Sequence, residues 1–259
     1  MKKTKWIMGM PITIEILDKG SSASSILQIF NYFDSVDNKF STYKKTSEIS
    51  AINYDKLKEN AYSKDMQEIL QLAEKTNQET FGYFNIVHNG IVDPSGVVKG
   101  WSIYNASKML RKMGFENFYI DAGGDIQVNG KNTNGNNWSV GIKNPFNTNE
   151  IIKVIQIANE GVATSGNYIR GTHIYNPLQV TDSLDDIVSI TVIGPNVLEA
   201  DRFATAAFAM QRNGIIFFEN LPGFEAYMID KNGIATFTSG FNRYTRNHIN
   251  SHKHKYTTL

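Results

Sequence analysis

The sequence has no cysteine, and this absence excludes three kinds of chemistry. Disulfides, thiol nucleophiles and cysteine-ligated zinc all need that side chain. Long apolar runs are absent too, so no segment has the roughly 18 apolar residues that a membrane-spanning helix needs. Charge of one sign is not in excess, because 26 Lys and Arg stand against 25 Asp and Glu. We therefore expect neither nucleic-acid binding nor a membrane span.

Several familiar signatures are also missing. The chain contains no GxGxxG, GxxxxGK[ST], HExxH or GxSxG pattern. The first residues, MKKTKWIMGMPITIEI, are basic but continue into an alternating pattern rather than the apolar core of a signal peptide. We expect a cytoplasmic protein, although an exported protein whose leader has been removed would look the same.

What is present is an ordinary globular composition with mixed periodicity. The 259 residues are 41% hydrophobic, which is enough for a sizeable core. Alternation predicts strands, and apolar spacing of three and four predicts helices. No regular βαβ repeat occurs, so we predict an α+β fold, with one domain at 1–240 and a polar C-terminal tail at 241–259. The predicted strands are 6–17, two within 117–130, 138–145, 151–159, one from 161, 187–194 and a pair in 225–237; the predicted helices are 22–37, 47–53, 64–79, one that follows a turn within 96–114, and one from 197.

One predicted helix has an unusual polar pair. The segment VLEADRFATAAFAMQ, 197–211, is rich in alanine but places Asp201 and Thr205 four residues apart. Positions i and i+4 share one face of a helix. The pair indicates either a salt bridge with a solvated threonine, or an oxygen-lined site for a hard cation such as Mg²⁺.

Three other segments are compatible with ligand binding. DPSGVVKGW, 93–101, predicts a tight turn before a helix with Lys99 and Gly100 at its start, where a phosphate could bind, although an ordinary turn with a solvated lysine fits as well. ATSGNY, 163–168, is a run of small and hydroxyl residues that suits a polar ligand or a plain turn. GGD, 123–125, is most simply a glycine bulge that bends a strand.

The order of the motifs is more specific than any one of them. The segments MGMPITIEI, FSTYKKTSEISAIN, GVVKGWSIY, IDAGGDIQVNG, WSVGIKNP, VATSGNY, HIYNP, VSITVIGP and EADRFATAAF follow one another between about residue 7 and about residue 236. This succession resembles the ApbE family, the FAD:protein FMN transferases. The resemblance implies two intimately packed α+β halves with a nucleotide cleft between them. It also implies Mg²⁺-dependent cleavage of FAD, transfer of FMN to a Thr or Ser hydroxyl of another protein, and release of AMP.

The resemblance also implies roles for individual residues. Asp201, Thr205 and the backbone carbonyl of Val98 correspond to the metal ligands of the family. Lys99 would add positive charge at the pyrophosphate, and His173 is the candidate general base. The residues expected to contact FAD are Met8, Tyr43, Tyr83, Phe84, Asn85, Ser95, Lys99, Trp101, Thr164, Ser165 and Tyr175.

The sequence departs from the family pattern near the expected FAD site. Asn85 stands where the family usually has Asp, and the stretch from Asn85 to Lys99 is shorter than is typical. Two alternatives to transfer therefore stay open. The site could pass FMN to water, as an FAD pyrophosphatase, or the chain could bind FAD without catalysis. The expected acceptor is a reductase or electron-transfer subunit with a Thr or Ser flavinylation site.

Overall fold

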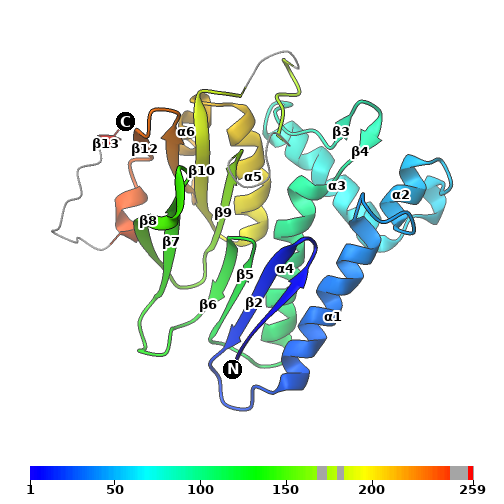
Figure 1. Ribbon diagram of the computed structural model, residues 1–259, viewed down its shortest axis with the longest axis horizontal. Helices are drawn as coiled ribbons and strands as arrows, with labels where there is room; N and C mark the ends of the chain where they lie inside the picture. Colours follow the sequence, from blue (N-terminus) through cyan, green and yellow to red (C-terminus); the bar gives the residue numbers. More distant parts are fainter. Residues whose placement is uncertain (168–173, 180–183, 246–255, 259) are drawn as a thin grey trace.

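A nine-stranded sheet organises the protein, as seen in a computed structural model that describes residues 1–167, 174–179, 184–245 and 256–258 (Figure 1). The strand order is β1-β2-β5-β6-β9-β10-β11-β12-β13, and among the described strands of this sheet the β12–β13 pair is parallel and the other pairs are antiparallel. Two hairpins, β3–β4 and β7–β8, form separate small sheets. The strands are β1 (Lys2–Ile7), β2 (Met10–Ile16), β3 (Val87–His88), β4 (Ile91–Val92), β5 (Phe118–Ala122), β6 (Asp125–Asn129), β7 (Trp138–Asn144), β8 (Asn147–Ile157), β9 (Gly161–Gly166), β10 (Ile187–Gly194), β11 (Glu225–Asp230), β12 (Ala235–Phe237) and β13 (Tyr256–Thr258).

Helices cover one face of this sheet, and the mixed architecture confirms the predicted α+β class. Helix α4 lies between α1 and α5, and α5 packs on β9 and β10 (Figure 1). The α-helices are α1 (Ala23–Phe40), α2 (Glu48–Asn53), α3 (Lys64–Glu79), α4 (Ser95–Lys112), α5 (Val197–Ala209) and α6 (Asn213–Glu219), and the 3₁₀ turns are η1 (Glu59–Ala61) and η2 (Phe241–Tyr244).

The β7–β8 hairpin covers part of the opposite face. Alternate residues of β10 therefore enter two different apolar clusters: Ile190 and Val192 pack with α5, whereas Ile193 packs with Trp138 and Ile155 of the hairpin. Burial on both faces explains why β10 is almost continuously apolar in sequence rather than alternating. This central strand and its neighbour β9 give α5 a fixed platform.

The N-terminal segment differs from its prediction. Residues 6–17 were predicted as one strand, but a turn at Met8 and Gly9 divides the segment between the paired strands β1 and β2. Both turn residues have positive φ, 56° and 71°, as a two-residue hairpin turn with the twist of its strands requires. The apolar alternation continues through this turn, so the pattern gave no sign of it. The hairpin β3–β4 and helix α6 were likewise not predicted.

The C-terminal segment packs against the core beyond residue 240. Phe241 is fully buried in the apolar cluster that contains Trp138 and Ile155 of the β7–β8 hairpin. Thr245 forms an isolated β-bridge with Ile155, and β13 pairs with β12. The predicted tail at 241–259 is therefore not uniformly detached from the domain. In the part of the chain that the structure describes, no helix is both long and apolar enough to cross a bilayer.

Candidate functional site

The site begins where α4 and α5 approach each other at Gly100. A Cβ atom there would lie 2.7 Å from the Asp201 Cβ and 2.8 Å from the Val197 carbonyl oxygen, so a side chain would push the two helices apart. The absence of a side chain allows the Gly100 N–H to donate to Asp201 Oδ2 over 2.7 Å. The glycine of the Lys-Gly pair thus brings the α5 carboxylate against α4.

Lys99, the other member of that pair, lies between two carboxylates. Its Nζ is 2.6 Å from Asp125 Oδ2 and 3.6 Å from Asp201 Oδ1. The two acidic side chains are only 2% and 4% exposed. Asp125 Oδ1 also accepts the Thr164 N–H at 3.1 Å. Four elements, α4, α5, β6 and β9, therefore meet at one buried cluster of charge.

The environment of Asp201 disfavours its anionic form. Burial raises the pKa of Asp201 to about 7; the Lys99 ammonium and the Gly100 N–H oppose this rise, and the neighbouring Asp125 adds to it. A carboxyl group in this situation gains from a nearby positive charge, because a cation stabilises the ionised form. The raised pKa and the cavity beside it are features that often mark a functional site.

Asp201 and Thr205 both line the cavity, as their shared helix face predicts. The Thr205 hydroxyl donates to the Asp201 main-chain oxygen, one turn earlier, at 3.2 Å. The segment around Val98 differs from its prediction, because α4 already begins at Ser95. Val98 and Lys99 are therefore the fourth and fifth residues of the helix, whereas Lys99 was predicted at its start. Val98 is buried in the core, and its role as a carbonyl ligand stays a prediction.

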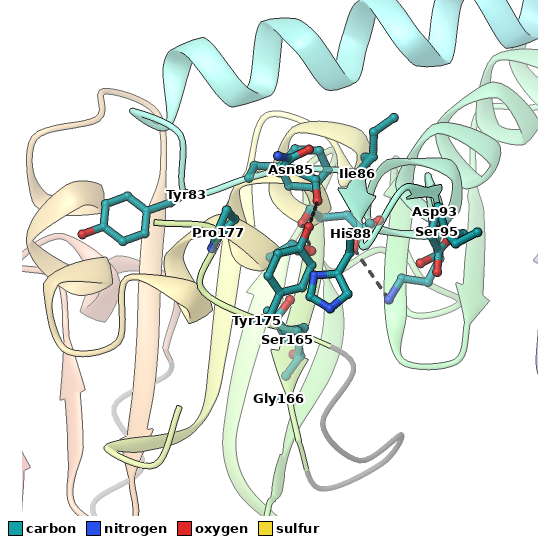
Figure 2. A pocket seen from close by; sticks show the side chains of 18 of the residues that line it. Tyr83, Asn85, Ile86, His88, Asp93, Ser95, Ser165, Gly166, Tyr175 and Pro177 are labelled. Atoms are coloured by element: carbon teal, nitrogen blue, oxygen red, sulfur yellow. Dashed lines mark hydrogen bonds and ion pairs between the residues drawn. The ribbon is translucent and has the colours of Figure 1, made fainter. Parts of the chain in front are cut away.

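A cavity of about 410 Å³ opens above the charged cluster. Its lining is mixed, with apolar rings, hydroxyl groups and charged side chains, as is usual for a small-molecule site. Figure 2 shows the side chains of Asn85 and His88, from the β3–β4 region, beside those of Ser165 and Tyr175 in its lining. The residues predicted from sequence that line this cavity are Tyr83, Phe84, Asn85, Ser95, Lys99, Thr164, Ser165, Tyr175, Asp201 and Thr205.

Three other predicted FAD contacts do not line this cavity. Met8 is in the β1–β2 turn and packs on the core. Tyr43 is 96% exposed. Trp101 is buried, packs edge-on against Phe40 and donates from Nε1 to Glu68 at 2.8 Å. Methionine and aromatic side chains suit a core as well as a flavin, which is why residue type alone did not separate the two roles.

The candidate base His173 lies outside the described residues. Tyr175, two residues further along the chain, is described, and its hydroxyl donates to the carbonyls of Asn85 and Val87 at 3.0 Å each. The Tyr175 ring also packs against His88, with ring centroids 4.1 Å apart (Figure 2). The short stretch after Asn85 thus forms a hairpin that supplies one wall of the cavity.

Asp125 and His88 are the site residues that the sequence reasoning missed. The available signal for Asp125 was its carboxylate directly after two glycines, in a segment interpreted as a strand bulge. Gly123 and Gly124 have positive φ, 63° and 100°, and form the turn between the paired strands β5 and β6. The predicted break between two strands is therefore confirmed, whereas the bulge interpretation is wrong. The contact of Asp125 with Lys99 depends on β6 lying next to β9 and beneath α4, which is a non-local arrangement.

The sequence and the fold of this chain are both similar to those of known proteins. Residues 8–94 and 88–228 match the model of the ApbE family. A protein from Haemophilus influenzae named FAD:protein FMN transferase is 25% identical, over 90% of this chain and 87% of that protein. Among solved structures, flavin transferase ApbE from Vibrio cholerae has a TM-score of 0.82 at 22% identity, covering 94% of this chain and 98% of that one. The ApbE protein from Thermotoga maritima has a TM-score of 0.85 at 19% identity, covering 95% and 99%. The two structures establish the likeness of fold, and because the family model matches most of the sequence, this chain belongs to the ApbE family.

Proposed function

We propose that this protein is a Mg²⁺-dependent FAD:protein FMN transferase, which moves FMN from FAD to a Thr or Ser hydroxyl of an acceptor protein and releases AMP. The observation that carries the proposal is the buried cluster of Lys99, Asp125 and Asp201 beside the aromatic-lined cavity. The name of the Haemophilus influenzae relative supports the same reaction. The substrate is FAD, and the partner is the acceptor protein.

The donor set fits Mg²⁺. This ion prefers oxygen ligands and uses one or two carboxylates, with water and substrate phosphates completing its shell. Asp201 supplies a buried carboxylate, and a bound cation would lower its raised pKa. Thr205 supplies a hydroxyl one turn away. We assign these two side chains and the Val98 carbonyl as the ligands. Bound Mg²⁺ would neutralise the pyrophosphate and stabilise charge on the departing AMP.

The protein's own groups account for positioning and proton transfer. The acceptor hydroxyl oxygen attacks the FMN-side phosphorus, a new P–O bond forms, and the bond to the bridging oxygen breaks so that AMP leaves with the electron pair. The hydroxyl proton passes to a base, for which we propose His173. Lys99 brings positive charge to the phosphates, while the rings of Phe84 and Tyr175 offer flat apolar surface to the flavin.

The test is an incubation with FAD and Mg²⁺, with and without a purified candidate reductase or electron-transfer subunit. Transfer predicts AMP only when the acceptor is present, together with flavin fluorescence that stays on the denatured acceptor. AMP without acceptor would indicate an FAD pyrophosphatase instead. No AMP under either condition would indicate an FAD-binding protein. The cytoplasmic location stays a prediction.

A further inference from the structure

Asp125 has an arrangement that the proposed reaction does not by itself require. The residue begins β6, directly after the Gly123–Gly124 turn, and its side chain is almost fully buried. One carboxylate oxygen accepts the Thr164 N–H from β9, and the other is ion-paired with Lys99 of α4. The carboxylate therefore fixes the lysine relative to the strand that carries two cavity-lining hydroxyl residues.

The position of the lysine matters because Asp201 is the other carboxylate within its reach. Lys99 Nζ is 1.0 Å nearer to its Asp125 partner oxygen than to Asp201 Oδ1, at 2.6 Å against 3.6 Å. In a buried site, an ammonium in full contact with Asp201 would compete strongly with a divalent cation for the same oxygen. Asp125 opposes that competition by drawing the ammonium toward β6.

We propose that Asp125 is a positioning residue, which holds Lys99 away from Asp201 and thereby keeps the Asp201 carboxylate available to a divalent cation. The inference rests on the proposed function only in taking Asp201 as a metal ligand. Two cations then share the carboxylates of Asp125 and Asp201: the Lys99 ammonium, which is part of the protein, and the divalent ion, which can exchange. Asp125 acts on the metal through Lys99. In a variant without this lysine, the substitution of Asp125 must therefore have little effect on the affinity for the divalent cation.

That dependence gives a double-substitution test. Asp125→Asn keeps an oxygen that can accept the Thr164 N–H but removes the charge that attracts Lys99. Mn²⁺, a spectroscopic substitute for Mg²⁺, is titrated into the protein without FAD, and free Mn²⁺ is followed by electron paramagnetic resonance. We expect Asp125→Asn to weaken Mn²⁺ binding about 10- to 100-fold, the usual range for groups that orient metal ligands. We expect Asp125→Asn combined with Lys99→Met to bind within about threefold of the wild type, since one carboxylate then has no competing ammonium.

Asp121→Asn is the matched control. Asp121 lies on the same strand–turn–strand segment, accepts the Gly124 N–H at 2.9 Å and does not line the cavity. Its substitution removes the same charge nearby and should leave Mn²⁺ affinity within about twofold, because its carboxylate is held by the Gly124 N–H and the Tyr119 hydroxyl. Thermal melting of every variant identifies any loss of affinity that comes from misfolding.

Each other result overturns the inference. Unchanged Mn²⁺ affinity in Asp125→Asn would make Asp125 a structural residue only. A double variant as weak as Asp125→Asn would make Asp125 a metal ligand rather than a positioning residue. A wild type that binds no Mn²⁺ would remove Asp201 as a ligand. The acceptor assay is independent: if the metal series behaves as expected but no FMN is transferred, the proposed function fails and the role of Asp125 stands.

Discussion

At the scale of single residues, the site depends on a glycine in the interior of a helix. Glycine is normally unfavourable there, by about 1 kcal/mol relative to alanine. At Gly100 the cost is offset by the close approach of Asp201 and by the N–H···O bond that this approach permits. The same argument explains why lysine and glycine occur together: the glycine admits the second helix, and the lysine places an ammonium between the Asp125 and Asp201 carboxylates.

Gly100→Ala is therefore expected to destabilise the protein, although alanine favours helix. The new methyl group would overlap Asp201 and Val197, and overpacking of this kind costs about 1–3 kcal/mol. Urea denaturation should show the loss, and Mn²⁺ affinity should fall with it. The control is Lys112→Ala, at the exposed end of the same helix, which should change stability by less than about 0.5 kcal/mol. A Gly100→Ala protein as stable as the wild type would contradict the close approach of α4 and α5.

At the scale of elements, α5 is tied to α3 by one buried arginine. Arg202 is 2% exposed, forms ion pairs with Glu79 of α3 and Glu199 of α5, and donates to the Thr76 hydroxyl at 3.3 Å. Arg202 follows Asp201 directly, so this tie fixes the helix that carries the proposed metal ligands. It also anchors the C-terminal end of α3, which leads to Tyr83 and Phe84 in the cavity wall.

Arg202→Leu should cost about 2 kcal/mol of unfolding free energy, since it removes the charge-assisted hydrogen bonds of a buried guanidinium to two partly exposed carboxylates. The matched substitution is Lys75→Ala, which removes an exposed cation from the same Glu79. Exposed pairs contribute little, so that change should cost about 0.5 kcal/mol. Chemical denaturation of both variants measures the difference. Equal effects would show that the arginine has no special part in joining α3 to α5.

A second connection between elements predicts a pH dependence. Asp18, after β2, accepts the backbone N–H groups of Glu116 and Asn117 at 3.0 and 2.8 Å and the Asn117 side chain at 2.9 Å, just before β5. Partial burial raises the pKa of Asp18, but these hydrogen bonds outweigh it, and the pKa lies below the ordinary value of 3.8. The folded state therefore holds the ionised form better than the unfolded state does, so the stabilisation is present above about pH 4 and is lost as the pH falls further.

Asp18→Ala should accordingly be less stable than the wild type by about 1 kcal/mol or more at pH 7. The difference should shrink as the pH is lowered from 4 to 2, because the wild-type carboxylate then becomes protonated. Urea denaturation across this range provides the measurement. A difference that stays constant with pH would mean that the charge of Asp18 plays no part.

At the scale of the whole molecule, the sequence predicted what depends on local periodicity and failed where distant segments meet. The α+β class follows from the helical period of 64–79 and from short apolar runs such as 187–194, and the shared face of Asp201 and Thr205 follows from helical geometry alone. The partner of Lys99 could not be predicted, because it comes from β6, and only the sheet order brings that strand under α4.

The same limit explains the residues that matched the family motifs but do not line the cavity. Tyr43 lies in a segment that resembles the family, yet its side chain is exposed, and Trp101 follows the Lys-Gly pair, yet it faces the core. A motif establishes the path of the backbone, whereas the direction of a side chain depends on packing against α1 and α3. Local pattern and order of motifs therefore identified the family, and the three-dimensional arrangement was needed to separate cavity residues from core residues.

The most direct measurement of the central claim is acceptor-dependent AMP release from FAD as a function of Mg²⁺ concentration, for the wild type, Asp201→Ala and Thr205→Ala, with melting curves for each. Asp201 is the proposed metal site's full carboxylate ligand, so Asp201→Ala should lose Mg²⁺-dependent turnover while staying folded, since alanine favours helix more than aspartate does. Thr205→Ala should need more Mg²⁺ and recover in part at high concentration. An Asp201→Ala protein that keeps the wild-type Mg²⁺ curve would contradict the metal site and the transfer mechanism built on it.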